Sequence, residues 1–372
     1  MPGQDANTAA LPSAGAPERD LSACIEGAAG IVELNRPRAL NALTSAMRAD
    51  IAAAFTAWAR DPQVYAALIV SGTERAFCAG GDVREMVACG RRDLDAACRL
   101  LAAEYALNWQ LDCFCKPTVA LMDGVAMGSG VGITLFGTHR VAGERYRFAM
   151  PECGIGLFPD DGVGWVLARL PDAIGMYLAL TGRSIGRADA WRLGLVTHCV
   201  PAAAFGDIRR AVADADPVDP VLDERHEEPG AGELDAVRET IARCFGAGSV
   251  EGVVAALEAE QGTGRSWAEG ALRDLGRASP TSLKVTFRHM REAAGLDLAA
   301  TLAQNYRLAC RFMAGHDFYE GVRAALVDRD QAPKWRPERL ADVSAAVVEG
   351  YFAPLEGEEL QLASRGEMQA VR

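Results

Sequence analysis

Two acidic residues of the chain, Glu152 and Asp160, have the type and the spacing to do chemistry together. Glu152 follows Pro151, and Asp160 ends the run Gly156-Leu-Phe-Pro-Asp160. A glutamate in a loop is more often a solvated surface residue, but a carboxylate among apolar residues is less typical of the surface. Partial burial raises the pKa of such a group and lets it exchange a proton near neutral pH. The pair therefore predicts a site that moves protons or activates water.

A glycine-rich turn, Gly128-Ser129-Gly130, follows the apolar run Thr118–Met122 and opens a segment that is compatible with a helix. The free N–H groups at a helix start can bind an anion or polarise a carbonyl. A second turn, Ala79-Gly80-Gly81-Asp82, can supply another N–H. Two donors from separate turns are what an oxyanion hole needs. Close packing of small residues is the alternative explanation of either turn.

Other kinds of site are disfavoured. A dinucleotide-binding fingerprint would need a glycine where Ile133 stands, and a nucleophile elbow would need one in place of Met127. The five histidines show no pattern with a serine or cysteine nucleophile. Ten cysteines are scattered without a Cys-x-x-Cys pair or a histidine at metal-ligand spacing. We therefore expect no metal site, and buried reduced thiols in a cytoplasmic protein.

The composition limits the partners of the chain. Its net charge is −12 and it has no basic run, which argues against a nucleic-acid partner. No apolar stretch reaches the roughly 18–20 residues that cross a bilayer, so we expect no membrane span. Residues 1–20 are rich in Ala, Pro and Gly and lack the features of a secretory signal or a typical transit peptide, which predicts a disordered lead.

The elements that must position the carboxylates and the glycine turns begin with a strand, a helix and a strand. Residues 30–35 alternate as a strand does, and residues 66–70 are apolar enough for a strand buried on both faces. Between them, Met47, Ile51 and Phe55 recur at helical spacing. This βαβ unit favours a parallel sheet. Further helices are expected at 94–112, from Gly128 onward, at 174–181, at 187–193 and from Ser279 onward, and further extended segments at 118–122 and 145–150.

The composition divides the chain into parts. Residues 21–213 carry the strands and the candidate site, and we treat them as the core. Residues 214–233 are acidic and hold three prolines, which predicts a surface excursion or linker. Residues 234–355 have a helical pattern almost throughout, and the polar residues 356–372 predict a loose tail.

Several segments resemble the crotonase (enoyl-CoA hydratase/isomerase) superfamily: Leu34–Leu43, Arg75–Asp82 and Lys116–Asp161. Within it the chain is most similar to the 3-hydroxyisobutyryl-CoA hydrolases. That closer resemblance depends on Ala149–Asp160 and on segments outside the common core, namely Ser279–Lys284, Asn305–Leu308, Gly315–Ala324 and Asp328–Trp335. The resemblance covers about residues 24–355.

The resemblance implies an α/β fold, a crotonase-like spiral of ββα units with a helical C-terminal region, that holds an acyl-CoA thioester. The backbone N–H groups of Gly81 and Ser129 would form the oxyanion hole, Glu152 and Asp160 would be catalytic, and Glu104 would face the acyl pocket. CoA is part of the substrate, and no other cofactor is implied. The residues implied near CoA are Arg36 or Arg38 at its phosphates, with Ala39, Leu40, Ala79, Gly80 and Asp82.

Two positions depart from the family pattern. Ser129 stands where glycine is common; its N–H remains, but its hydroxyl would crowd the acyl group. Hydratases carry a second glutamate four residues beyond the first glycine of the turn, and that position is Gly132 here. The departure disfavours addition of water to a C=C bond and favours thioester hydrolysis by Glu152 and Asp160.

The expected function is hydrolysis of a short branched or β-hydroxy acyl-CoA thioester, with 3-hydroxyisobutyryl-CoA, an intermediate of valine breakdown, as the preferred candidate. Two alternatives stay open: an enoyl-CoA hydratase or isomerase, and a non-catalytic acyl-CoA-binding protein. Glu152 would act as nucleophile or as general base. The C-terminal helices would cover the acyl pocket or form the contact of a homo-oligomer.

Overall fold

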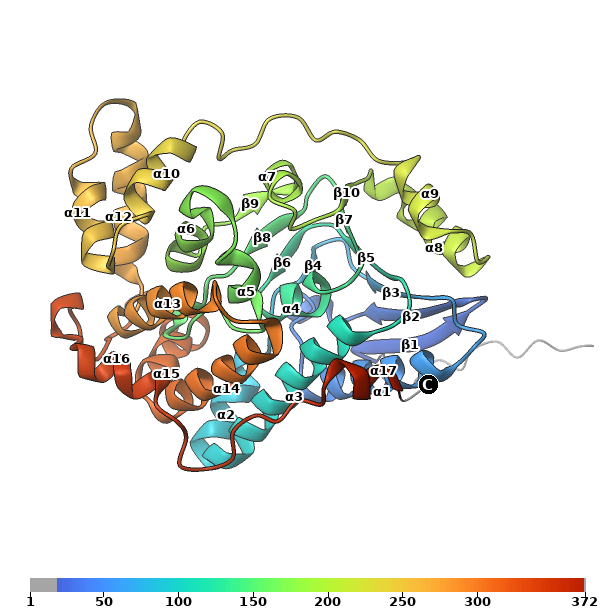
Figure 1. The fold of residues 1–372 in the computed structure, drawn as a ribbon, viewed down its shortest axis with the longest axis horizontal. Coiled ribbons are helices and arrows are strands. Elements are labelled where there is room, and N and C mark those ends of the chain that lie inside the picture. Colours follow the sequence, from blue (N-terminus) through green and yellow to red (C-terminus); the bar gives the residue numbers. More distant parts are fainter. Residues whose placement is uncertain (1–18, 371–372) are drawn as a thin grey trace, which may run out of the picture.

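The computed structural model describes residues 19–370, without the side chain of Ala370. Nearly all of the predicted disordered lead, residues 1–20, lies outside these residues. Two sheets, in each of which most neighbouring strands are parallel, form the centre of the molecule, and helices surround them (Figure 1). Within the described residues no helix is long and apolar enough to cross a membrane.

The large sheet has the strand order β1-β2-β3-β5-β7-β10. Only β1 pairs antiparallel to its neighbour, and the other pairs are parallel. The predicted βαβ unit is confirmed, because β2 and β3 are adjacent and parallel. The strands span Leu21–Glu26 (β1), Ala29–Leu34 (β2), Ala66–Ser71 (β3), Thr118–Met122 (β5), His139–Ala142 (β7) and His198–Cys199 (β10).

A second, smaller sheet has the order β4-β6-β8-β9. Each of its first three strands follows a strand of the large sheet along the chain, so the chain alternates between the sheets before it enters a helix. This alternation is the expected spiral of ββα units. The strands of the second sheet span Ala76–Cys78 (β4), Val125–Met127 (β6), Arg147–Ala149 (β8) and Ile185–Gly186 (β9).

Helices cover both faces of the large sheet. Successive residues of β2 show this division, since Ile31 packs toward α8 and α9 (Val218–Asp223), whereas Val32 packs toward Phe55 of α1. A side-chain cap opens α1, because the Thr44 hydroxyl accepts a hydrogen bond from the Met47 amide. The helices of the core are α1 (Ser45–Arg60), α2 (Val83–Arg92), α3 (Leu94–Cys113), α4 (Ser129–Leu135), α5 (Val163–Leu167), α6 (Ile174–Thr181), α7 (Arg187–Arg192) and α8 (Phe205–Ala213).

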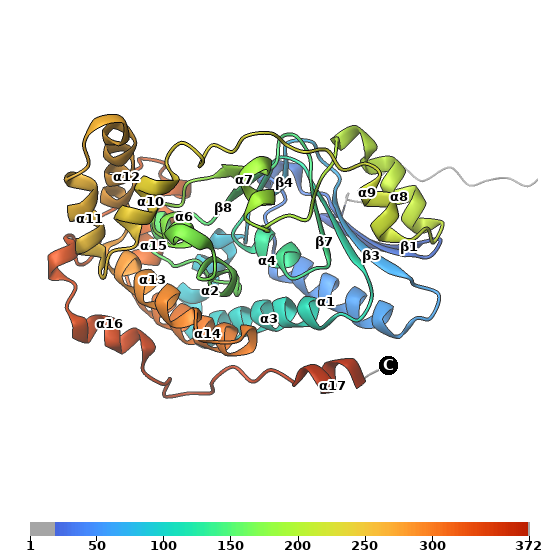
Figure 2. The ribbon, with the colours of Figure 1, turned by 45° about the horizontal axis from the view of Figure 1, so that its top comes forward.

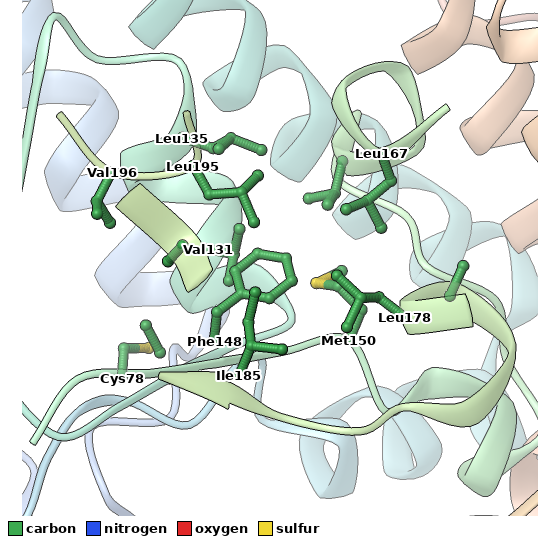
Figure 3. Packing of buried hydrophobic residues seen from close by; sticks show 14 of the residues in the cluster. Cys78, Val131, Leu135, Phe148, Met150, Leu167, Leu178, Ile185, Leu195 and Val196 are labelled. Atoms are coloured by element: carbon green, nitrogen blue, oxygen red, sulfur yellow. The ribbon is translucent and has the colours of Figure 1, made fainter. Parts of the chain in front are cut away.

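The apolar side chains beneath the second sheet hold the glycine turn of α4 in place. Phe148 of β8 and Ile185 of β9 pack with Val131 of α4, and Met150 continues this contact toward Leu178 of α6 (Figure 3). All seven residues of α4 are buried. The core therefore fixes the position of α4 and of the turn that opens it.

The C-terminal region is helical, as predicted. Its first three helices lie together beside α6, and α14 lies along α3 (Figures 1 and 2). Phe312 of α14 and Tyr105 of α3 belong to the same buried cluster. These helices are α10 (Arg238–Phe245), α11 (Val250–Glu258), α12 (Arg265–Arg277), α13 (Pro280–Ala293), α14 (Leu298–Ala314), α15 (Asp317–Val322) and α16 (Ala345–Phe352).

Two predictions about the chain outside these elements need correction. The segment 214–233 is not wholly a surface excursion, because it contains α9 (Val218–Asp223), whose Val218 and Leu222 are buried against the large sheet. The tail is not loose over its described part. The Trp109 indole of α3 donates a hydrogen bond of 2.7 Å to the Ala363 carbonyl, and α17 (Arg365–Ala370) follows at once along α3 (Figure 2).

Candidate active site

A cavity of about 580 Å³ lies between the core and the C-terminal helices. On its C-terminal side it is lined by Met313 of α14, Phe318 of α15, Leu326 and Arg329. The side facing the core brings together all the residues predicted for the site: Arg36, Arg38, Ala39, Leu40, Ala79, Gly80, Gly81, Asp82, Glu104, Ser129, Glu152 and Asp160.

The two glycine-rich turns meet at one side of this cavity. A Cβ atom built on Gly81 would lie 3.1 Å from the Ser129 hydroxyl, so the two residues are immediate neighbours. The bridge between Gly81 and Leu43 uses the Gly80 carbonyl and the Asp82 amide, which leaves the Gly81 N–H outside this pairing. Ser129 is the first residue of α4, where N–H groups have no acceptor within the helix. Two backbone donors are thus available beside each other.

The two predicted carboxylates, Glu152 and Asp160, are buried beside these donors, 6% and 7% exposed. A Cβ on Gly128 would lie 3.0 Å from Glu152 Oε1, so this carboxyl touches the turn that precedes Ser129. On the far side, the Tyr105 hydroxyl donates a hydrogen bond of 2.7 Å to Asp160 Oδ2. Glu152 and Asp160 therefore belong to one buried group and not to the surface.

Burial changes the acid strength of both carboxyls. It raises the pKa of Glu152 well above its ordinary value, and the nearby charge of Asp160 raises it further. Burial likewise raises the pKa of Asp160 to about 7; Glu104 adds to this increase, and the hydrogen bond from Tyr105 opposes it. Asp160 therefore exchanges a proton near neutral pH, and its charge favours the protonated form of Glu152.

Arg48, a buried cation of α1 that also lines the cavity, was not predicted from the sequence. Its Nη2 lies 2.6 Å from Glu104 Oε1 and donates to the Ser129 hydroxyl at 3.3 Å. Burial alone would lower the pKa of Arg48, but the Glu104 carboxylate and other nearby acids outweigh this effect and raise it. A signal was present, since Arg48 precedes Ile51 and Phe55 by three and seven residues on the apolar face of α1.

Asp161 is a second missed residue. It is fully buried with a backbone φ of +54°, and neither of its carboxyl oxygens has a hydrogen-bond partner among residues 19–370. Burial and the charge of Asp160 raise its pKa well above the ordinary value. A Cβ on Gly132 would lie 2.8 Å from the Asp161 Cβ, so this side chain occupies the space in front of Gly132. The glutamate position of hydratases is empty on α4, but a carboxyl group stands there from another segment.

The residues expected near CoA play unequal parts. Asp82 caps α2 by accepting hydrogen bonds from the amides of Arg84 and Glu85. Arg36 Nη1 lies 2.8 Å from Asp82 Oδ2 and also donates to the Ala42 carbonyl. Arg38 is exposed and makes no ion pair within the described residues. Of the two arginines, Arg38 is thus the one with a free guanidinium at the cavity.

Comparison with known proteins decides the family. The enoyl-CoA hydratase/isomerase family matches residues 29–352, most of the chain. The chain belongs to this family. The resemblance and the crotonase-like fold predicted from the sequence are thereby confirmed.

This chain is a member of the enoyl-CoA hydratase/isomerase family, and its relatives include proteins named as hydrolases and a protein named as a dehydratase. The chain is 41% identical to the mitochondrial 3-hydroxyisobutyryl-CoA hydrolase of Danio rerio, with 90% of each chain covered. It is 37% identical to the one of Homo sapiens, with 90% of this chain and 89% of that protein covered. A solved structure named carnitinyl-CoA dehydratase, from Mycobacterium thermoresistibile, is 40% identical with a TM-score of 0.87. That match covers 92% of this chain and 99% of the other.

The names of these relatives contradict one prediction. The hydrolases of Danio rerio and Homo sapiens are named mitochondrial, whereas a cytoplasmic protein was predicted from the sequence. The prediction used the reduced cysteines and the arginine-poor residues 1–20. Reduced thiols are compatible with either compartment, so they do not distinguish the two.

Proposed function

We propose that the chain hydrolyses a short branched or β-hydroxy acyl-CoA thioester, with 3-hydroxyisobutyryl-CoA as the preferred substrate. The observation that carries this proposal is the placement of the buried Glu152 carboxyl against the turn that presents the Ser129 amide. Relatives named 3-hydroxyisobutyryl-CoA hydrolase, similar over about nine-tenths of both chains, support the same substrate. This reaction would give the chain a place in valine breakdown.

The substrate would lie along the cavity with its thioester carbonyl at the glycine turns. The carbonyl oxygen accepts hydrogen bonds from the Gly81 and Ser129 amides, and these strengthen as the oxygen becomes an anion. Loss of one such donor typically costs about 2.7–4 kcal/mol in the barrier. The exposed guanidinium of Arg38 is placed to meet the CoA phosphates, because Arg36 is already paired with Asp82.

Glu152 has two routes to the products. As a nucleophile, its carboxylate attacks the carbonyl carbon, the C–S bond breaks, and CoA leaves as the thiol after it takes up a proton. Water then cleaves the mixed anhydride. As a general base, Glu152 removes a proton from water while that water attacks the same carbon; the C–S bond then breaks, and the thiolate of CoA takes up the proton from Glu152. In both routes Asp160, held by Tyr105, orients the water or the substrate hydroxyl and exchanges a proton with Glu152.

An isotope experiment can identify the nucleophilic route. After a single turnover in heavy-oxygen water, mass analysis of Glu152 detects label only if the anhydride forms and water attacks the glutamyl carbon. Label in Glu152 therefore shows the nucleophilic route, whereas label in the released acid alone fits both the general-base route and attack of water on the acyl carbon of the anhydride.

A second function, hydration of an enoyl-CoA, is favoured by one observation. The Asp161 carboxyl stands in front of Gly132, where hydratases place their second acid. It does not line the cavity, whereas Asp160 does, and this difference favours the hydrolase. An assay that offers crotonyl-CoA beside 3-hydroxyisobutyryl-CoA tests the choice: release of CoA thiol supports hydrolysis, and loss of the enoyl absorbance without thiol supports hydration. A chain that binds both thioesters and turns over neither would be a binding protein.

A further inference from the structure

Three buried polar side chains from different elements meet beside the cavity: Arg48 of α1, Glu104 of α3 and Ser129 at the start of α4. Arg48 Nη2 lies 2.6 Å from Glu104 Oε1, and the Ser129 hydroxyl donates to the same oxygen at 2.5 Å. The three residues are between 4% and 8% exposed, and all of them line the cavity. They form a polar patch on the wall of the cavity.

Within this group of three side chains, one carboxylate oxygen of Glu104 remains available to a ligand. Both contacts of this carboxylate use Oε1, and within residues 19–370 no hydrogen bond to Oε2 is present. A carboxylate oxygen is a strong acceptor, and it loses its hydration when an apolar group covers it. The cavity thus presents an acceptor that a hydroxylated ligand satisfies and a hydrocarbon does not.

Arg48 holds this acceptor in place. A Cβ on Gly81 would lie only 2.5 Å from Arg48 Nη2, so the guanidinium lies directly against the turn that supplies an amide of the oxyanion hole. A buried carboxylate without its counter-ion takes up a proton or leaves the site. Arg48 is the cation that pairs with Glu104 among the described residues. The orientation of the Glu104 carboxylate therefore depends on Arg48.

We propose that Arg48 is a positioning residue that makes the pocket selective for hydroxylated acyl groups, by holding Glu104 so that its free oxygen accepts a hydrogen bond from the substrate hydroxyl. The inference rests on the proposed function and adds the feature of the substrate that is recognised. In a 3-hydroxyacyl thioester, a single carbon separates the carbonyl carbon from the carbon that bears the hydroxyl. Because Glu104 touches Ser129, a carbonyl bound at the Gly81 and Ser129 amides would place that hydroxyl within reach of Glu104.

Binding measurements test the inference without turnover. The parent is the Glu152→Gln variant, which lacks the attacking carboxylate, and calorimetry compares 3-hydroxyisobutyryl-CoA with isobutyryl-CoA. We expect the hydroxylated thioester to bind at least about tenfold more tightly, as for a hydrogen bond to a charged group. Adding Arg48→Met should reduce this ratio to within about threefold, mainly by weakening the hydroxylated ligand, whereas Arg48→Lys should keep most of it. A parent without preference, or equal weakening of both ligands by Arg48→Met, would overturn the inference.

Arg48→Met leaves Glu104 buried without its cation, which can prevent folding. A second variant avoids this problem. Arg48→Met with Glu104→Leu replaces the ion pair by apolar side chains, a change that buried pairs often tolerate. This variant should bind isobutyryl-CoA at least as tightly as the parent and show no preference for the hydroxylated thioester. A preference that persists in it would overturn the inference. Thiol release by the unmodified chain tests the proposed function separately. The ratio of the two binding affinities does not depend on turnover, so it is measured whether or not the chain releases thiol.

Discussion

The Asp161 side chain occupies the space into which a side chain on Gly132 would project, with 2.8 Å between the Asp161 Cβ and a Cβ built on Gly132. In most exposed helix positions alanine is preferred over glycine by about 1 kcal/mol. Here we expect Gly132→Ala to destabilise the chain by about 1–3 kcal/mol, the cost of overpacking a core.

Substitution of Asp161 tests whether its side chain causes that loss of stability. In an Asp161→Gly background, Gly132→Ala should cost less than in the unmodified chain, whereas in an Asp161→Asn background, which keeps the shape, it should cost as much. Urea unfolding of the three Gly132→Ala variants and of their three parents gives the coupling between the two positions. Equal costs in all three backgrounds would show that Asp161 is not the obstacle.

Asp161 should also give the stability a pH dependence. Its folded-state pKa lies above that of the unfolded chain, so the folded form holds the proton more tightly. The stability that this provides is present below the unfolded pKa and is lost as the pH rises through the folded pKa. Asp161→Asn, which cannot ionise, should therefore raise the Tm at pH 9 and change it little at pH 4.

An exposed acid provides the control for this measurement. Asp50 lies on the exposed side of α1, and Asp50→Asn should shift the Tm by a small amount that does not grow between pH 4 and pH 9. A Tm difference for Asp161→Asn that stays constant over the same range would contradict the account of a buried, proton-holding carboxyl.

Tyr105 should set the acid side of the pH–rate profile. Its hydroxyl donates a hydrogen bond to Asp160 that lowers the pKa of this carboxyl, so Tyr105→Phe raises the pKa. If ionised carboxylates drive the reaction, kcat/KM should fall by roughly two- to tenfold at pH 6.5 and approach the parental value at pH 9. An equal loss at every pH would indicate a structural role for Tyr105 instead.

Substitutions of Arg38 and of Arg36 should have different effects. Arg38 is exposed without an ion pair among the described residues, so Arg38→Ala should raise KM for acyl-CoA by roughly two- to tenfold, more at low salt. An acyl-pantetheine substrate, which lacks the CoA phosphates, should show no such change. Arg36→Ala removes the partner of Asp82 and should lower the Tm. A KM effect of Arg38→Ala on both substrates would contradict the assignment.

Local patterns predicted the long elements well. Helix α1 and strand β3 followed from apolar spacing, because each buries one face or both against neighbours. The two- and three-residue strands of the second sheet, such as β4 and β9, are too short to show a period. Helix α9 was hidden by prolines and acids, and the ordered tail by its polarity, since the Trp109 contact that holds it is far away in sequence.

The site shows the same division. The glycine turns and the Glu152–Asp160 pair were predicted because each lies in one continuous segment. The ion pair of Arg48 with Glu104 joins two helices that are distant in the chain, and no local pattern specifies such a partner. The placement of Asp161 depends on its positive φ, which directs its side chain away from the cavity that Asp160 lines.

The most direct test of the proposed function measures CoA thiol release from 3-hydroxyisobutyryl-CoA by the unmodified chain and by its Glu152→Gln variant. The variant keeps the size of the side chain but can neither attack the thioester nor accept a proton as a carboxylate. We expect thiol release by the unmodified chain and a decrease of at least about 100-fold in the variant, with thioester binding retained. Full hydrolase activity in the variant would contradict both routes, and no thiol release by the unmodified chain would contradict the proposed function itself.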